Sequence, residues 1–286
     1  MNMAQCTVED APDADPKSWL ASRVDAGALQ ALRREIGRCT AVSSSTLRRE
    51  EDYTAAVAGR LDLLGSWKLP RVRNSRHPDC FVRFSARITD KYNQGGRPSE
   101  ESQIGADVGV VLTVATDELS VELGHLAQAK ILNRRDYESF TFSNERGKSQ
   151  LDRLQKADPT SAYWLANHVP HTDTSPRSWR YRYSVVPSNF VRAAMPAAAQ
   201  SVTLHTSKLA LQARSFPDYL LGDVVGMRVG SPLTVPVASG GIDMSQAGLI
   251  LWVVAGSASR AEEIALPAVL ADTTRLDFPE ALDDAD

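Results

Sequence analysis

The sequence has little cysteine and no long hydrophobic run, and both absences limit the class of protein to which it can belong. Its 286 residues include three cysteines, Cys6, Cys39 and Cys80, which are far apart and form no Cys-x-x-Cys pair. This usage argues against structural zinc and favours a reducing compartment. The apolar run at 249–255 has only the length of a strand, far short of the roughly 20 residues that span a bilayer. Because the N-terminus is acidic and unlike a signal peptide, we expect a cytoplasmic protein without a membrane partner.

Positive charge is not in excess either. The formal net charge is −3, whereas a non-specific binder of duplex nucleic acid is usually basic. The sequence contains no Walker loop, no Rossmann fingerprint after a strand and no Gly-x-Ser-x-Gly elbow, so these three motif-marked classes receive no support. With 43% hydrophobic and 23% charged residues, the composition is that of an ordinary globular protein with a sizeable core.

The charges that are present are distributed unevenly. Residues 98–129 hold six acidic residues and no Lys or Arg. The preceding stretch, 67–97, has eight basic residues against two acidic ones, and 130–192 has eleven against six. A metal site needs carboxylates without cations that neutralise them, while a phosphodiester needs cations around the site. An acidic segment between two basic flanks suits both requirements.

Polar residues interrupt two apolar segments inside this acidic stretch. Asp107 precedes the β-branched run 108–114, and Gln128 and Lys130 lie in the alternating segment 119–132. Residues two apart in a strand point to the same face, so Gln128 and Lys130 should lie side by side. Because burial of a Lys and a Gln is costly without partners, we expect Asp107 to be their partner.

A structural explanation of the same residues stays open. Gly-Ala-Asp before a strand is common turn chemistry, and Gln-x-Lys is common on the solvated face of a β-hairpin. Asp107 and Lys130 would then form an exposed ion pair worth at most about 1 kcal/mol.

Asp107 with Gln128-x-Lys130 resembles the PD-(D/E)XK nuclease superfamily, in particular its Gln-x-Lys variants in Mrr-type restriction endonuclease domains. The resemblance implies that Asp107, Gln128 and an upstream acid, Glu101 or Glu100, bind Mg²⁺. It also implies that Lys130 orients or activates the attacking water. The family order of helix, three strands, helix and strand is matched by a predicted helix at 51–64, a helix at 149–156 and a strand at 162–165. Gln128 departs from the carboxylate of many members and offers only a neutral oxygen.

Other residues near the motif are weaker candidates. The resemblance makes a Glu of the leading helix, Glu50 or Glu51, a further possible ligand, although acids in a first helical turn also simply favour the helix dipole. Five residues are candidates for nucleic-acid contact, each with a solvated surface position as the alternative: Arg97, Arg134, Arg135, Gln150 and Arg153.

Taken together, the pattern predicts an α/β (α+β) fold with a central mixed sheet flanked by helices, and the resemblance implies that this sheet is restriction-endonuclease-like. We expect a disordered segment at 1–16, a helical extension at 17–48, a nuclease-like core at 49–192, a C-terminal α/β extension of the same domain at 193–276 and an acidic tail at 277–286. Within these, we expect a helix near 204–213, and a polar loop or frayed helix at 133–148.

The function that this implies is Mg²⁺-dependent hydrolysis of DNA, in a restriction or phage-defence setting. A protein partner (a helicase, an ATPase or a sensor subunit) or a homo-oligomer would help to grip the DNA. Two alternatives remain open. One is a non-catalytic nucleic-acid-binding or scaffold subunit on a nuclease-like fold, and the other is an unrelated α/β protein that binds another protein through its acidic ends.

Overall fold

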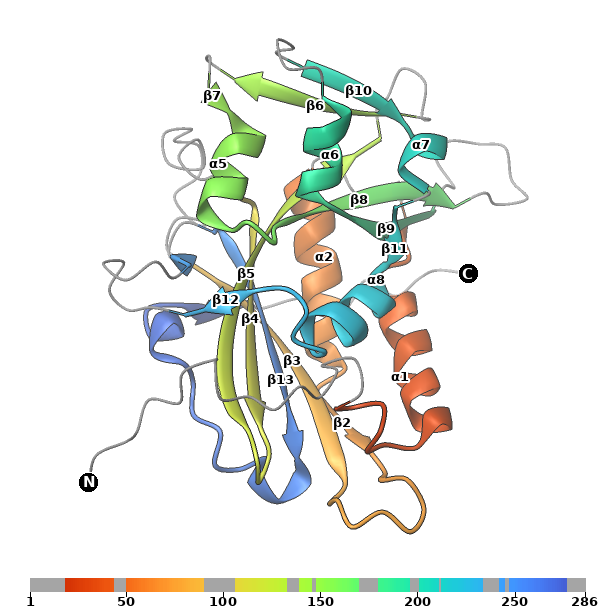
Figure 1. The fold of residues 1–286 in the computed structure, drawn as a ribbon, viewed down its shortest axis with the longest axis vertical. Coiled ribbons are helices and arrows are strands. Elements are labelled where there is room, and N and C mark those ends of the chain that lie inside the picture. The colour runs from red at the N-terminus through yellow and green to blue at the C-terminus, as the bar shows by residue number, and fades with distance from the viewer. Residues whose placement is uncertain are drawn as a thin grey trace.

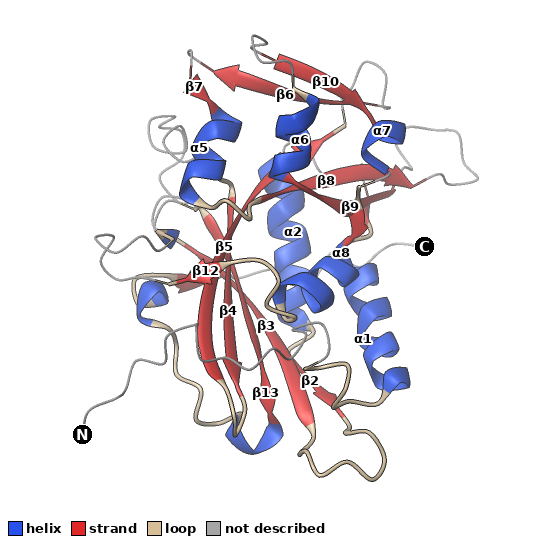
Figure 2. Ribbon diagram, in the orientation of Figure 1, coloured by secondary structure: helices blue, strands red, loops and turns tan. Residues whose placement is uncertain are grey.

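The computed structural model describes ten stretches of the chain: 19–43, 50–89, 106–132, 139–145, 148–169, 180–195, 201–210, 212–233, 242–244 and 247–276. The predicted N-terminal segment 1–16 and the acidic tail 277–286 lie outside them. The described elements form a large mixed sheet with helices on both faces and a small second sheet (Figures 1 and 2). The predicted α/β (α+β) class with a central mixed sheet is therefore confirmed.

The large sheet has 11 strands, eight of them in the order β1-β9-β8-β5-β4-β13-β3-β14. Their bounds are β1 (Val42–Ser43), β3 (Cys80–Ile88), β4 (Val108–Ala115), β5 (Ser120–Ile131), β8 (Ala162–Val169), β9 (Arg180–Pro187), β13 (Leu249–Ser257) and β14 (Thr274–Arg275). Three short strands pair at the margins: β2 (Ser66–Leu69) with β3, β11 (Arg214–Ser215) with β9 and β12 (Ser231–Pro232) with β5.

The centre of the sheet is built from segments that are far apart in the sequence. Strand β13 pairs in parallel with β4 and antiparallel with β3, and all of its residues are buried, as are all of those in β4. A strand that is buried on both faces carries a continuous apolar run rather than an alternating one. This explains the unbroken hydrophobic segments that the sequence shows at 108–114 and 249–255.

Helices cover the two faces of the large sheet. On one face α1 (Ala26–Cys39), α2 (Glu50–Leu63) and α8 (Phe216–Asp218) pack over Trp164, Val185 and Val253. On the other face α5 (Gln150–Ala157), α6 (Ser188–Ala194) and α7 (Thr206–Ala210) pack over Tyr163 and Ile250. A π-helix, η2 (Tyr219–Val224), continues α8, and two short 3-10 helices, η5 (Ala258–Arg260) and η6 (Ala268–Leu270), follow β13. The site strands thus lie inside a three-layered core.

The predicted order of elements around the motif is present. Helix α2, strands β3, β4 and β5, helix α5 and strand β8 follow one another in the chain, with β6 (Ser139–Glu145) and β7 (Lys148–Ser149) between β5 and α5. Helix α2 begins at Glu50, and α5 begins at Gln150. Strand β5 pairs antiparallel with β4 and parallel with β8, so that β5 lies between the start of β4 and the strand after α5.

Two local predictions differ from the structure, and alternation explains both differences. The helix predicted near 204–213 is present but shorter, as α7 (Thr206–Ala210), and strand β10 (Ser201–His205) precedes it. The predicted loop or frayed helix at 133–148 contains strand β6, which pairs antiparallel with β10. Phe140 and Phe142 are buried and lie opposite Leu204 and Val202, so period-two burial outweighs the local helix preference of the Ala-rich sequence nearby. Figure 1 shows this small sheet, β10-β6-β7, at one end of the molecule.

Among the described residues, the longest helices are too short and too polar to cross a bilayer.

Candidate functional site

Asp107 lies immediately before β4 and links this strand to β5. Its backbone N–H donates to the carbonyl of Ala127 at 3.1 Å. Its carboxylate Oδ2 accepts a hydrogen bond from the backbone N–H of Ala129 at 3.0 Å and another from the side-chain amide of Gln128. The predicted contact between Asp107 and the Gln-x-Lys strand is therefore present, and it is made through Gln128.

Gln128 is buried, with 2% of its surface exposed, and both ends of its amide are hydrogen-bonded. Its nitrogen donates to Asp107, and its oxygen accepts from Nε2 of Gln150 at 2.9 Å. Gln150 is the first residue of α5, so the helix start reaches into the site. A buried amide is tolerated because its donor and its acceptor are both satisfied. Of the weaker candidates, Gln150 is the one that the described contacts bring to the motif.

Lys130 corrects one expectation, because its ion-pair partner is Glu50 rather than Asp107. The distance from Lys130 Nζ to Glu50 Oε2 is 3.3 Å, and Glu50 Oε1 accepts from the backbone N–H of Ile131 at 3.1 Å. The side chains of Lys130 and Glu50 are 17% and 32% exposed. The pair therefore lies at the solvent-facing edge of the site, beside the more enclosed Asp107 and Gln128.

The charges of these groups act on one another. Burial raises the pKa of Asp107 to about 7, with Lys130 opposing the shift and Glu50 adding to it, while the hydrogen bonds from Gln128 and Ala129 also favour the ionised form. Burial also raises the pKa of Tyr163 and of Tyr183, and the nearby Asp107 adds to both shifts. A carboxylate in this environment is costly to ionise, and a bound cation would relieve that cost.

The site offers few oxygen ligands for a hard divalent cation. Among the described residues, no group of three or more His, Cys, Asp and Glu side chains is placed to hold a metal. The site offers oxygens from Asp107 and Glu50, with the Gln128 amide beside them. Mg²⁺ fits such a set because it binds through one or two carboxylates and keeps several waters. The described donors to Asp107 all use Oδ2, which leaves Oδ1 as the oxygen for a ligand.

Several predicted residues cannot be placed in the site. Glu101, the alternative acid Glu100, and the candidate contacts Arg97, Arg134 and Arg135 lie outside the described residues. Arg153 lies three residues after Gln150 on α5 and is half-buried, and its Nε has no hydrogen-bond partner within the part of the chain that the structure describes. The second carboxylate that the structure brings to the motif is Glu50, a first-turn acid for which the helix dipole was the alternative explanation.

Comparison with known proteins adds no assignment, because no family model, no curated protein and no solved structure matches this chain. The site is therefore defined by its geometry: an acid at the start of β4, an amide and an amine on β5, and the first residues of two helices, α2 and α5. The positions of these elements around β5 can be followed in Figure 1.

Proposed function

We propose that the chain is a Mg²⁺-dependent nuclease that hydrolyses phosphodiester bonds of DNA. One observation carries the proposal. Asp107, Gln128, Lys130 and Glu50 come from three separate elements and are joined by direct contacts or by electrostatic interaction in one place. An acid, an amide and an amine with this placement are the groups expected from the resemblance to PD-(D/E)XK nucleases, and Glu50 supplies a second acid.

Metal binding is assigned to the two acids. Asp107 would hold the ion through Oδ1, and Glu50 would contribute a carboxylate directly or through a water. A bound Mg²⁺ would neutralise charge on the phosphoryl oxygens and favour ionisation of a water. Gln128 fixes the rotamer of Asp107 by donating to Oδ2, and Gln150 in turn fixes Gln128. This support matters because catalytic groups lose effect when they are misplaced by as little as about 1 Å.

Lys130 is assigned the role of donor to the reacting groups. Its ammonium is held at the edge of the site by Glu50 and remains partly exposed. Two of its three N–H donors can therefore face a phosphate oxygen or the attacking water. A fixed positive charge at this point stabilises the charge that develops on the phosphoryl group.

The substrate and the setting follow from charge and from the resemblance. The basic flanks of the acidic segment supply cations for a phosphate backbone, while the net charge of −3 gives the chain little non-specific grip of its own. We therefore assign most of the DNA binding to a protein partner (a helicase, an ATPase or a sensor subunit) or to a homo-oligomer. The restriction or phage-defence setting, with a cytoplasmic location, belongs to the same proposal.

A second candidate is a non-catalytic nucleic-acid-binding or scaffold subunit on a nuclease-like fold. The observation in its favour is that both polar ends of the Gln128 amide form hydrogen bonds inside the protein, one with Asp107 and one with Gln150. A Gln in that state gives no ligand to a metal. In this candidate the motif stabilises the junction of β4, β5 and α5 and performs no chemistry.

Plasmid nicking separates the two candidates. Supercoiled DNA is incubated with wild-type protein in Mg²⁺ or in EDTA, and with Asp107→Asn and Lys130→Met. Lys68→Met, an exposed lysine on β2, is the matched control. Three results together support the nuclease. Nicking requires Mg²⁺, it falls by about 10²-fold or more in both site variants, and it persists in the control. DNA retention without nicking, unchanged in both variants, supports the second candidate. Circular dichroism must show that the variants are folded.

A further inference from the structure

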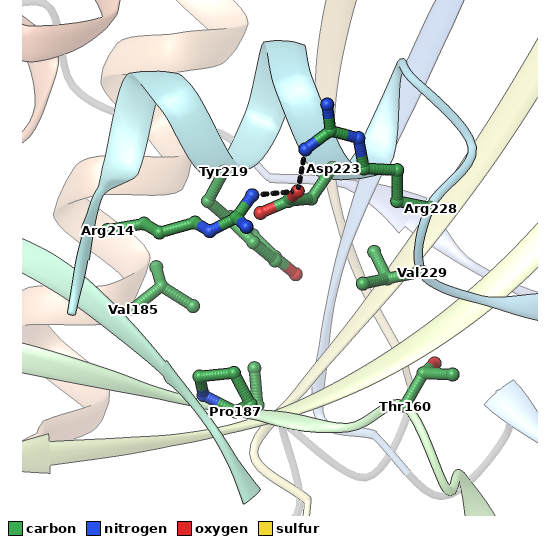
Figure 3. A pocket seen from close by; sticks show the side chains of 9 residues that line it. Thr160, Val185, Pro187, Arg214, Tyr219, Asp223, Arg228 and Val229 are labelled. Atoms are coloured by element: carbon green, nitrogen blue, oxygen red, sulfur yellow. Dashed lines mark hydrogen bonds and ion pairs between the residues drawn. The ribbon is translucent and has the colours of Figure 1, made fainter. Parts of the chain in front are cut away.

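A separate pocket lies between two strands of the large sheet and the segment that follows β11. Its volume is about 210 Å³. Strand β8 contributes Ala162, strand β9 contributes Val185 and Pro187, and Val229 closes the opposite wall (Figure 3). These four side chains give the pocket an apolar lining on two sides. None of the residues that line it belongs to the Asp107 site.

The remaining wall carries two arginines that share one acid. Arg214 and Arg228 both donate to the same oxygen, Oδ1, of Asp223, and the Arg228 contact is 3.4 Å long. Figure 3 shows both guanidinium groups beside this carboxylate, each joined to the same oxygen. Asp223 balances one of the two cations, so the wall has a net charge of +1. Arg228 Nε is buried and has no hydrogen-bond partner among the described residues, so the wall also has an unused donor.

A buried hydroxyl in the pocket also has no acceptor. Tyr219 is 2% exposed, and its Oη has no acceptor among the described residues. Figure 3 shows the ring descending from the π-helix with Oη in the space between Val185, Pro187 and Val229. Burial raises the pKa of this hydroxyl well above its usual value, and the Trp164 indole only partly opposes the shift. The hydroxyl therefore keeps its proton at neutral pH and can donate a hydrogen bond, and a buried donor without an acceptor is costly.

The backbone around these residues is unusual in the same place. Tyr219 and Asp223 both belong to the π-helix η2, a conformation that is rare and frequent at functional sites. Met227, directly before Arg228, has a φ of 58°, a left-handed conformation that residues other than glycine rarely adopt. The turn is held by the N–H of Arg228, which donates to the carbonyl of Asp223 at 2.8 Å. The geometry that brings Arg228 back onto Asp223 is thus maintained by specific contacts.

We propose that this pocket binds a small organic monoanion. Its charged group, a carboxylate or a phosphodiester, accepts from Arg214, Arg228 and the Tyr219 hydroxyl, and its apolar body lies against Val185 and Pro187. A single negative charge matches the net +1 of the wall, and guanidinium groups bind carboxylates and phosphates in the same planar geometry. The volume is below the roughly 300 Å³ at which pockets for drug-sized ligands begin, so the ligand is small.

Calorimetric titration at low salt tests the proposal with three probes. Benzoate and diethyl phosphate are monoanions with an apolar body, and benzamide has the shape of benzoate without the charge. We expect benzoate, diethyl phosphate or both to bind with a Kd of about 1 mM or tighter, and benzamide to bind at least about 10-fold more weakly. Binding of only one anion identifies the group that the pocket prefers.

Variants then assign the binding to this pocket. Tyr219→Phe removes the hydroxyl and keeps the ring, so the fold is preserved, and it should weaken the bound anion by about 5-fold or more. Arg214→Gln should weaken it by about 10-fold or more. Arg192→Gln is the matched control, because Arg192 and Arg214 have equally exposed side chains, at 50%. The proposal is overturned if neither anion binds at about 10 mM, if benzamide binds as well as benzoate, or if Tyr219→Phe binds like wild type.

Discussion

Lys130 on β5 and Glu50 at the first residue of α2 form an ion pair with an Nζ to Oε2 distance of 3.3 Å, although 80 positions separate them in the sequence. The other oxygen of Glu50 accepts from the backbone N–H of Ile131 at 3.1 Å. One carboxylate thus ties the start of a helix to the end of a strand, and it fixes the ammonium beside Asp107. This pair places a second acid and the amine at the candidate site together.

Glu50→Gln should reduce nicking more than it reduces stability. The variant loses the charge that holds Lys130 and one candidate metal ligand, so we expect the nicking rate to fall about 10-fold or more. The free energy of unfolding should fall by only about 1 kcal/mol or less, because the ion pair is partly exposed. Glu51→Gln, an exposed acid in the same helical turn, is the control. Equal rates for the two variants would remove Glu50 from the site.

Gln128→Glu should make the stability of the protein depend on Mg²⁺. The change replaces the amide that donates to Asp107 by a carboxylate, so in the absence of a metal ion two acids face each other where the site is most enclosed. We expect the free energy of unfolding in EDTA to fall by about 1–3 kcal/mol. Because a bound cation removes the repulsion, Mg²⁺ should raise the Tm of the variant more than that of wild type. The measurement is thermal unfolding with KCl at matched ionic strength, and equal Tm shifts would count against a metal at Asp107.

The contact between Asp107 and Gln128 was predictable from sequence, whereas the partner of Lys130 was not. Both residues are marked by local features, since the acid stands at the start of one apolar segment and the amide lies inside the next. Side chains alternate between the two faces of a strand, so the position of each residue fixes the face on which it lies. Glu50 carries the same local signal as any acid in a first helical turn, so its pairing depends on how α2 packs against β5. The apolar pattern of β13 predicted a strand, yet nothing local places it between β3 and β4. No sequence pattern indicated that Tyr219 and Asp223 line a pocket, because a π-helix has no clear sequence pattern.

Asp158 should make the protein lose stability in acid. Burial alone would raise its pKa, but hydrogen bonds from His125, from the N–H of Leu126 and from Thr160 outweigh burial and leave the pKa lowered. The charged form is therefore favoured in the folded protein, and its contribution is present above the unfolded pKa of about 3.9 and is lost as pH falls through the lower folded value.

Asp158→Asn tests this contribution. At pH 7 the variant should lose about 2 kcal/mol of unfolding free energy, because the amide nitrogen faces donors that the carboxylate accepts from. The difference between wild type and variant should shrink as pH falls below about 4. Denaturant unfolding of both proteins across this range is the measurement. A difference that stays constant down to the acid transition of wild type would contradict the assignment.

Cys39 should be unreactive in the folded protein. Burial raises the pKa of its thiol to about 12, Arg60 opposes the shift and Glu35 adds to it, and the thiol donates to the carbonyl of Arg60 at 3.5 Å. Since the thiolate is the nucleophile, iodoacetamide at pH 8 should not modify Cys39 within about an hour. Burial also raises the pKa of Cys80, so the same result is expected there.

Intact-mass measurement checks this in a Cys6→Ser background, because Cys6 lies outside the described residues. We expect no added mass on the native protein and two modifications after unfolding in denaturant. Rapid modification of the native protein at either position would show that the segments around α1 or β3 open more readily than their packing predicts.

The claim that Asp107 anchors a divalent cation is tested most directly by a crystal soaked in Mn²⁺, which replaces Mg²⁺ and gives an anomalous signal. We expect one anomalous peak at coordination distance from Asp107 Oδ1 and near Glu50, present in wild type and lost in Asp107→Asn. A wild-type crystal that shows Mn²⁺ elsewhere, or the same peak in Asp107→Asn, would contradict it.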